Sequence, residues 1–464
     1  MRRASFVLGL ILVLALGISA VSAQDSLANV DPTGQTITYW HQYQDTGAQG
    51  KTIAAIIDAF NKTNQYKITV QAKYQGNYGQ ISQLVNAGIT SGELPNLVAG
   101  YADDAASYAQ DNSVVDLKTY IDDPKWGLGA NPDINQGLLA TDTVNGKVLA
   151  FPNQSSAEVM AYNSTLLKQA GFDGSMPTDP ATFEKEACAA SKLKDSKGNQ
   201  VQGFALSTDS SPFESWVASM GGAIYHDGKY DFMSDAVKNT LQLYQDMYKQ
   251  GCAYFPAQQY GDQADFNNGV LPFYVTSTAG ISYIISGFTQ SGVKADWDIS
   301  TFPHTQGNEI VQAFAPSIIM MPSTPEAQLA SWIFLKYLAT PDVAVQWSTG
   351  SGYFNPVPST AATLKTATFG TPGLDKYFNE ANAQLNNPNI KVYGSPALAS
   401  YSKVRDLVST AIADVTSNGK DVATVMQTLQ QGADAAQSAD MAATPAATSS
   451  MMTPEATAMA TAAS

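Results

Sequence analysis

The amino-terminal third of the chain alternates between strand-like and helix-like segments. This alternation constrains the possible folds more than any other feature of the sequence. Residues 36–41 and 67–74 are rich in β-branched and aromatic residues, and 95–99 form a short apolar strand. Between the first two, Ile53, Ile56, Ile57 and Phe60 lie at the spacing of one helical face. Helices are also predicted from about 77 to 91 and from 103 onward. A βαβαβα order predicts a parallel sheet covered by helices on both faces.

Three tyrosines follow the strands of this predicted sheet. Tyr43, Tyr78 and Tyr101 lie just beyond a strand or at the entry of a helix. Because open α/β sheets bind ligands outside the carboxyl ends of their strands, we expect these tyrosines to gather at one edge.

The first 23 residues have the pattern of a secretory signal peptide. Arg2 and Arg3 precede an apolar run from Phe6 to Ile18, and Val21-Ser22-Ala23 forms a small-x-small cleavage site. A membrane anchor is the alternative, but it needs about 20 apolar residues. The sequence therefore predicts an exported protein, in the periplasm or outside the cell.

Charge and cysteine content narrow the function further. A net charge of −15 and a pI near 4.5 argue against a nucleic-acid partner, which would require a basic surface.

Cys188 and Cys252 are the only cysteines, and an even pair in an exported chain favours a disulfide joining two predicted helices, 180–192 and 235–250. A metal site is the weaker interpretation, because the cysteines and the three histidines lack ligand spacing. We predict neither metal nor cofactor.

Two later segments break the pattern. Residues 151–156 interrupt the alternation and predict a crossover between lobes. Residues 434–464 lack Leu, Ile, Val and aromatic residues, which predicts a disordered low-complexity tail; the alternative role for such a tail is a spacer to the cell surface.

Several short motifs together give a resemblance that covers most of residues 36–432. They are Tyr39-Trp40-His41, Ala59-Phe60-Asn61, 73–78 (KYQGNY), 151–163, which ends Ala161-Tyr162-Asn163, and Gly352-Tyr353 before Pro356. With them the chain resembles the family 1 extracellular solute-binding proteins of ABC importers, and within these the glycerol-3-phosphate-binding type.

The resemblance implies a two-lobed α/β fold, the type II periplasmic-binding-protein fold, with a mainly parallel sheet flanked by helices in each lobe. The lobes would comprise 36–152 plus 313–353 and 157–302 plus 359–433, with hinge crossovers near 151–156, 302–312 and 353–359. Such a protein closes over its solute and delivers it to a membrane permease. It also implies a monomer at the cell surface and no catalysis.

The resemblance further implies a set of ligand-binding positions in the cleft. Trp216 would stack on the apolar face of a sugar or glycerol, the hydroxyl side chains would bond ligand oxygens, and Arg405 would hold a phosphate. Each has a plainer alternative: Trp216 in the core, the serines in turns, and Arg405 on the surface. With Tyr101 from the strand pattern, the expected positions are Tyr78, Tyr101, Ser155, Ser156, Trp216, Ser277, Tyr353 and Arg405.

Two departures leave the ligand open. Pro316 stands where similar proteins offer a backbone N–H, and Ala102 follows Tyr101 where they have an acidic residue, with Asp103 one step later. A neutral sugar, a glycerophosphodiester and glycerol 3-phosphate all stay candidates.

Two other classes of function are alternatives. An exported carbohydrate hydrolase would need paired carboxylates, for which Glu158, Glu214 and Glu309 are candidates. A cell-surface interaction protein would bind a macromolecule.

Overall fold

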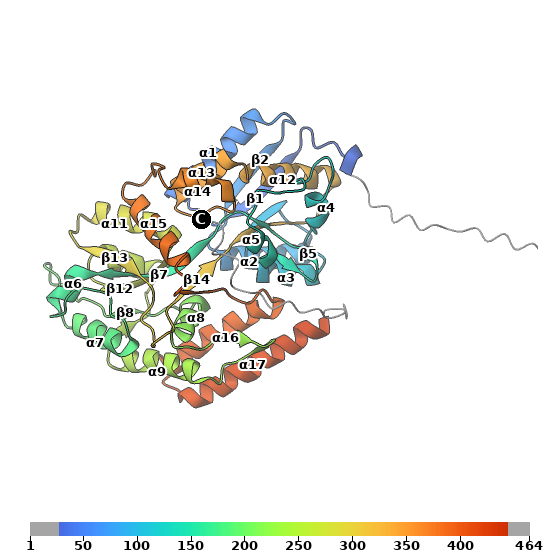
Figure 1. The fold of residues 1–464 in the computed structure, drawn as a ribbon. Coiled ribbons are helices and arrows are strands. Elements are labelled where there is room, and N and C mark those ends of the chain that lie inside the picture. The colour runs from blue at the N-terminus through green and yellow to red at the C-terminus, as the bar shows by residue number, and fades with distance from the viewer. Residues whose placement is uncertain (1–26, 444–464) are drawn as a thin grey trace, which may run out of the picture.

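Residues 27–443 are described by a computed structural model of the chain, which forms two α/β lobes (Figure 1). The predicted signal peptide, 1–23, and residues 444–464 lie outside the described residues. The first sheet has the strand order β2-β1-β3-β15-β6. Its strands are β1 (Thr36–His41), β2 (Thr69–Tyr74), β3 (Leu97–Gly100), β6 (Phe151–Pro152) and β15 (Ser317–Met320).

Helices cover both faces of this first sheet. On one face Ile53, Ile56 and Phe60 of α1 pack with Phe334 in the core cluster that contains Leu97. On the other face Val98, the neighbour of Leu97, packs with α2 and α3. Because successive side chains of a strand point to opposite faces, Leu97 and Val98 pack into two different cores, one on each face of the sheet. The strand–helix alternation predicts this arrangement. The helices are α1 (Ala48–Thr63), α2 (Tyr78–Ser91), α3 (Ala102–Gln110), α12 (Pro325–Leu338) and α13 (Pro341–Ser351).

The second sheet has the order β11-β8-β12-β7-β14-β16, and β13 also pairs with β7. In Figure 1 its helices lie at the left and along the bottom. The strands are β7 (Ser156–Asn163), β8 (Phe204–Ala205), β11 (Ala253–Tyr254), β12 (Phe273–Ser277), β13 (Trp297–Ser300), β14 (Ile310–Phe314) and β16 (Lys391–Tyr393). The helices include α6 (Ser164–Gln169), α7 (Pro180–Ala190), α8 (Ser210–Ser219), α9 (Asp235–Lys249), α10 (Gly261–Asn267), α11 (Ile281–Ser291), α15 (Leu374–Leu385), α16 (Ala399–Val415) and α17 (Val422–Ala443).

The α/β fold class is confirmed, and both sheets are mixed in strand direction. β1 is parallel to β2 and β3, whereas β15 is antiparallel to β3 and β6. In the second sheet β7 is antiparallel to β12, β13 and β14. The antiparallel strands enter each sheet from distant parts of the chain, which the local strand–helix pattern could not predict.

The chain passes between the two sheets at closely spaced points. β6 in the first sheet is followed by β7 in the second, and Ser155 between them exchanges backbone hydrogen bonds of 2.8 and 2.9 Å with Phe354. The crossovers predicted at 151–156 and 353–359 therefore lie side by side. The crossover expected at 302–312 falls later, between β14 and β15, because β14 pairs with β7 and so places residues 313 and 314 in the second sheet.

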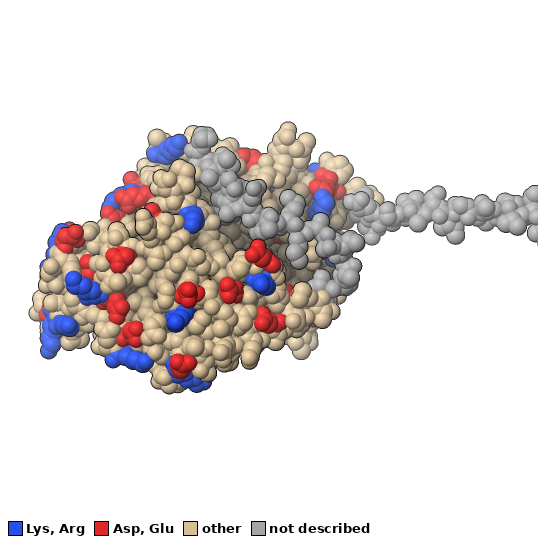
Figure 2. Space-filling view, turned by 60° about the horizontal axis from the view of Figure 1, so that its bottom comes forward, with Lys and Arg blue, Asp and Glu red and all other residues tan. Residues whose placement is uncertain are grey.

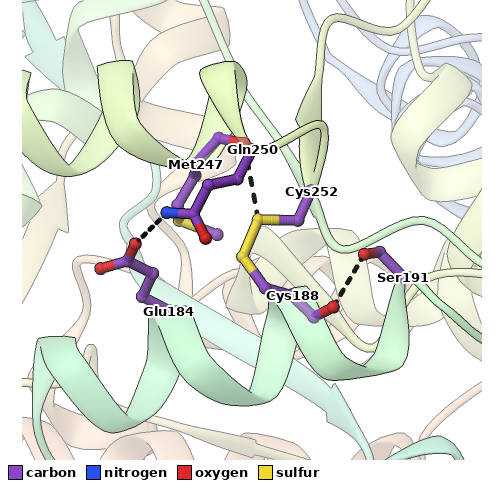
Figure 3. The surroundings of a disulfide bond; sticks show 6 residues. All are labelled: Glu184, Cys188, Ser191, Met247, Gln250 and Cys252. Atoms are coloured by element: carbon purple, nitrogen blue, oxygen red, sulfur yellow. Dashed lines mark hydrogen bonds between the residues drawn. A yellow bond between two sulfur atoms is a disulfide. The ribbon is translucent and has the colours of Figure 1, made fainter.

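The predicted disulfide is confirmed. Cys188 on α7 is bonded to Cys252, which follows α9, with a Cα–Cα distance of 4.8 Å (Figure 3). Beside it, Gln250 donates a 2.7 Å hydrogen bond to Glu184. The link staples two helices of the second lobe, as the sequence predicts.

The carboxyl-terminal helix continues further than predicted. α17 runs to Ala443, so residues 434–443, which we expected in the disordered tail, are helical. Alanine is the best helix former, so this segment needs few packing contacts. It also bonds to the rest of the molecule: the Gln437 side chain donates to the Gly228 carbonyl at 2.7 Å, and the Gln110 side chain donates to Asp440 at 2.6 Å.

Candidate ligand-binding site

The three tyrosines expected at one edge of the first sheet do gather there. β1, β2 and β3 end at His41, Tyr74 and Gly100, and the tyrosines lie just beyond these ends. The rings of Tyr78 and Tyr101 are 4.8 Å apart. The Tyr43 hydroxyl donates to the Gln154 side chain at 2.9 Å, which ties this edge to the crossover.

Two glutamine amides bind the Tyr78 hydroxyl. Gln42 donates to it at 2.6 Å and Gln154 at 3.3 Å. Asn77 positions the ring by capping α2, because its side chain accepts from the Gln80 backbone N–H while Gln80 bonds back to the Asn77 N–H. With two amides donating to its oxygen, the Tyr78 hydroxyl hydrogen points elsewhere, and the hydrogen bond between Tyr78 and Tyr353 takes it up.

Tyr353 joins this group from the far end of the chain. It follows Gly352, which ends α13 with φ 83°, a left-handed conformation that glycine adopts without strain. Its ring stacks on Trp347 at 5.8 Å and lies 6.5 Å from Tyr43. Burial raises the pKa of Tyr353 to about 12, against the lowering effect of its hydrogen bond with Tyr78. The first lobe therefore presents neutral hydroxyl and amide groups.

The second lobe presents charged groups instead. Arg405 on α16 pairs with Asp209, the N-cap of α8, at 2.7 Å, and the Arg405 side chain keeps 31% of its exposure. Burial and Tyr353 raise the pKa of Tyr101, whereas Arg405 lowers it, so the guanidinium acts on the tyrosine edge. Arg405 therefore lies near enough to Tyr101 to affect its ionisation and already has one carboxylate bound.

Asp103 adds to the negative charge around Arg405. Burial and the neighbouring Asp104 raise the pKa of Asp103 to about 7, and Arg405 opposes this rise. Burial also works against ionisation of Asp209, but Arg405 and Ser211 outweigh it and hold the Asp209 pKa below its usual range. One cation is thus shared among several acidic groups.

Two of the candidate catalytic carboxylates, Glu158 and Glu214, belong to one buried hydrogen-bond network. The Ser215 hydroxyl lies 2.5 Å from the Glu158 carboxyl group and 2.8 Å from the side-chain oxygen of Gln312, and the Gln312 side-chain NH2 donates to Glu214 at 3.4 Å. Burial raises the pKa of Glu158 to about 8. A serine has one hydrogen, so a protonated Glu158 that donates to Ser215 lets Ser215 donate to Gln312.

Glu214 connects this network to the carboxyl-terminal part of the chain. Its carboxylate accepts from Ser395 at 3.0 Å, from Tyr393 at 3.2 Å and from the Tyr401 hydroxyl. Glu309 lies apart from the network and accepts from Thr301 at 3.1 Å. Among residues 27–443 no group of three His, Cys, Asp or Glu side chains is placed to hold a metal ion.

Trp216 lies in the core of the second lobe. It is fully buried, with Phe183, Phe302 and Phe204 at ring distances of 5.0, 5.5 and 6.4 Å. The structure does not bring it together with the tyrosines, so the stacking role expected for it gives way to the core alternative. α8 is buried along most of its length, so both faces carry apolar residues and no periodicity distinguishes a core Trp from a cleft Trp.

The three predicted serines lie in or next to strands of the second sheet. Ser155 occupies the backbone bridge to Phe354, Ser156 is buried at the start of β7, and Ser277 ends β12. Ser317 follows Pro316, the residue that differs from similar proteins. The Ser317 hydroxyl donates to the buried Asp142 at 2.7 Å, so it is already used within the first lobe.

Sequence reasoning missed Gln42, Gln154 and Asp209. Gln154 lies within the crossover that was singled out, and Asp209 precedes Ser-Ser-Pro, a typical helix N-cap pattern. Gln42 carries no local signal, because its role depends on where α2 places Tyr78.

The two lobes also touch beside the site. The Gln49 side chain at the start of α1 donates to the Ala279 carbonyl of the second lobe at 2.9 Å, and Tyr283 lies 3.4 Å from the same amide. A Cβ at Gly47 would fall 2.6 Å from the Tyr283 hydroxyl, so a larger residue there would have to displace the Tyr283 side chain.

Comparison with known proteins now decides the family. The model for bacterial extracellular solute-binding proteins matches residues 55–371, well over half of the chain. The chain belongs to this family. Within 27–443 no helix has the length and apolar character needed to cross a bilayer.

Relatives of this solute-binding protein are distant but match along most of their length. The sn-glycerol-3-phosphate-binding periplasmic protein UgpB of Yersinia pestis is 25% identical over 402 residues, which cover 80% of this chain and 85% of that protein. UgpB of Salmonella typhimurium is also 25% identical, with 82% and 87% covered.

Solved structures share the fold at lower identity. The GacH receptor of Streptomyces glaucescens, solved with acarbose, has a TM-score of 0.71 at 16% identity and covers 87% of this chain and 98% of its own. UgpB of Mycobacterium tuberculosis in complex with glycerophosphocholine has a TM-score of 0.70 at 16% identity, with 87% and 99% covered. These neighbours confirm the two-lobed fold.

Proposed function

We propose that this solute-binding protein captures a neutral carbohydrate between its lobes and delivers it to the permease of an ABC importer. It acts outside the cytoplasmic membrane, as a monomer. The ligand lies among Tyr78, Tyr101 and Tyr353, opposite Arg405. The hydroxyl and amide groups of the first lobe match the donors and acceptors of a sugar, and the tyrosine rings match its apolar faces.

One observation carries the choice of a neutral ligand: the 2.7 Å ion pair between Arg405 and Asp209. A phosphate at Arg405 would lie next to Asp209 and near Asp103 and Glu214, which all interact with this guanidinium. Like charges a few ångströms apart repel each other, and at the surface of a protein this repulsion still amounts to a few kcal/mol. A neutral ligand leaves the ion pair intact.

Glycerol 3-phosphate and its diesters are the second candidate. The names of the UgpB relatives favour them, as does the presence of an arginine at the site. For such a ligand Arg405 would have to exchange Asp209 for the phosphate, and Arg405→Gln would then weaken binding by tenfold or more.

Thermal stability with a ligand panel tests the proposal. The panel contains glucose, maltose, cellobiose, trehalose, glycerol 3-phosphate and glycerophosphocholine. A ligand at a hundred times its Kd adds about 2.7 kcal/mol to the free energy of unfolding, so its melting shift is plain. A shift with saccharides alone supports the proposal, and a shift with phosphorylated glycerols alone overturns it. Hydrolysis of any saccharide in the same samples would support the hydrolase alternative instead.

A further inference from the structure

Gln42 bonds to several tyrosines of the first lobe at once. It is the first residue after β1, and its side-chain NH2 donates to the Tyr78 hydroxyl at 2.6 Å. Burial raises the pKa of Tyr43 and of Tyr353, and in both cases a hydrogen bond from Gln42 opposes the rise. The rings of Tyr43 and Tyr353 are 6.5 Å apart. One amide therefore links three tyrosines at the carboxyl ends of the strands.

The Gln42 side chain acts on these tyrosines as a donor. Its amide oxygen is buried, and within residues 27–443 no group donates to it. Gln154 supplies a second donor to the Tyr78 hydroxyl, at 3.3 Å. The orientation of the Gln154 amide follows from Tyr43, whose hydroxyl donates to the Gln154 oxygen at 2.9 Å and so leaves the NH2 for Tyr78. Two amide groups thus donate to the Tyr78 oxygen.

These contacts fix the direction of the hydrogen bonds that follow. A tyrosine hydroxyl has one hydrogen to donate and an oxygen that accepts through two lone pairs. Both amides use the Tyr78 oxygen, so the Tyr78 hydrogen goes to Tyr353. The Tyr353 oxygen accepts from Tyr78 and from Gln42, so its lone pairs are taken as well. The group left at Tyr353 is its hydroxyl hydrogen.

The ionisation of the two tyrosines agrees with this direction. Burial is the largest cause that raises the pKa of both Tyr78 and Tyr353. Their shared hydrogen bond adds to the rise at Tyr78 and opposes it at Tyr353. A hydrogen bond that uses the proton of a hydroxyl raises its pKa, whereas one that the oxygen accepts lowers it. Tyr78 is therefore the donor of the pair.

We propose that Gln42 is a positioning residue that sets the polarity of the site: it orders the hydrogen bonds from Tyr78 to Tyr353, so that Tyr353 offers a donor to the ligand. The inference rests on the proposed function and specifies that the saccharide presents an acceptor oxygen to Tyr353. Gln42 acts through the two tyrosines and needs no contact with the ligand. A ligand without that oxygen leaves a buried donor unpaired, which costs binding free energy.

Calorimetric titration of the purified protein with glucose and two series of its analogues tests this polarity. Each deoxy analogue has one hydroxyl replaced by hydrogen, and each deoxyfluoro analogue has the same hydroxyl replaced by fluorine, which accepts and cannot donate. At one position of the ring the deoxy analogue should bind about tenfold more weakly than glucose. The deoxyfluoro analogue of that position should bind within about threefold of glucose.

Gln42→Glu should reverse the order of the hydrogen bonds. A carboxylate accepts and does not donate, so Tyr78 donates to it, Tyr353 donates to Tyr78, and the ligand meets an oxygen lone pair. Glucose can supply a hydrogen of its own and should lose no more than about threefold, whereas the deoxyfluoro analogue should weaken about tenfold. Gln83→Glu, which adds the same charge at an exposed position of α2, is the matched control and should change neither affinity.

Gln42→Met is a second variant, which removes the donor without adding a charge. The difference between the deoxy and deoxyfluoro analogues should then fall below about threefold, because nothing fixes the direction of the tyrosine hydrogen bonds. Melting temperatures of the variants within about 2 °C of the parent protein verify that the substitutions act on binding.

Failure of this inference differs from failure of the proposed function. If glucose binds and the two series of analogues bind alike at every position, no donor faces the ligand. If their difference survives in both Gln42→Glu and Gln42→Met, Gln42 does not set it. Either result overturns the inference and leaves the proposed function standing. If no saccharide binds and glycerol 3-phosphate does, both are overturned.

Discussion

The two lobes meet at the proposed site with different chemistry. The first lobe brings tyrosine hydroxyls and glutamine amides, joined by hydrogen bonds such as the 2.6 Å contact between Gln42 and Tyr78. The second lobe brings Arg405, Asp209 and the buried network around Glu158 and Glu214. The first face presents neutral hydroxyl and amide groups, whereas the second uses its charges mainly on itself.

This comparison of the two lobes shows that charged residues near a binding site do not always indicate a charged ligand. Arg405 alone would suggest a phosphate, but its partner Asp209 removes most of that attraction. Figure 2 shows the same balance on one outer face, where basic and acidic side chains are interspersed. The substitutions below test the comparison, in order of decreasing effect.

Trp216→Ala tests whether Trp216 is a core residue of the second lobe and not a surface on which the ligand stacks. Removing a fully buried tryptophan should lower the free energy of unfolding by about 3–5 kcal/mol, because a cavity replaces its ring contacts. Urea unfolding followed by circular dichroism measures this. Trp216→Phe should cost clearly less and leave saccharide affinity unchanged; a large loss of affinity in a stable Trp216→Phe variant would return Trp216 to the site.

Arg405→Ala tests whether the charges of the second lobe serve each other. We expect a loss of about 2 kcal/mol in unfolding free energy, because Asp209 is left without its cation. The loss is smaller than for a fully buried ion pair, because water solvates both partly exposed side chains. A double-mutant cycle with Asp209→Asn measures the coupling, expected at about 1 kcal/mol. Additive effects of the two substitutions would show that the pair does not interact.

Glu158→Gln tests the protonated form of the buried network. The Glu158 pKa is about 8 in the folded state and near 4.3 when unfolded, so between these values the folded state holds a proton that the unfolded state lacks. Stability should therefore fall as pH rises from about 4.3 to about 8, by at most about 1.4 kcal/mol per pH unit from this group.

A glutamine at position 158 donates at every pH and should remove this part of the slope. Unfolding free energies at pH 5, 6, 7 and 8 give the comparison, with the exposed Glu93→Gln as control. An unchanged slope in Glu158→Gln would mean that Glu158 is ionised throughout.

Tyr78→Phe tests the hydroxyl group of the first lobe that two glutamine amides bind. Loss of one hydroxyl should weaken saccharide binding by about 1 kcal/mol, roughly fivefold, because Tyr353 loses a hydrogen-bond donor and the amides of Gln42 and Gln154 lose their acceptor. Tyr66→Phe is the matched control, since Tyr66 precedes β2 and so lies at the opposite edge of the sheet. Equal affinities of both variants would exclude Tyr78 from the site.

Local patterns predicted the elements of the first lobe well. The face of Ile53, Ile56, Ile57 and Phe60 is buried as the spacing requires, and the three tyrosines gather where the strand ends require. The disulfide followed from two cysteines in an exported chain. The end of the last helix was wrong, because an alanine-rich segment reads as low complexity although alanine favours helix.

The sequence by itself determined the fold class, the export signal it predicts, the disulfide pair and the family, because hydrophobic period, composition and short motifs are local properties. Only the tertiary structure decided that Trp216 lies in the core and that Asp209 occupies Arg405. It also decided that β7 and β15 run against their neighbours. Each of these depends on contacts between residues more than a hundred positions apart, or on which side of a wholly buried helix faces the cleft. The chain closes such contacts by packing two lobes together, and no local pattern records that packing.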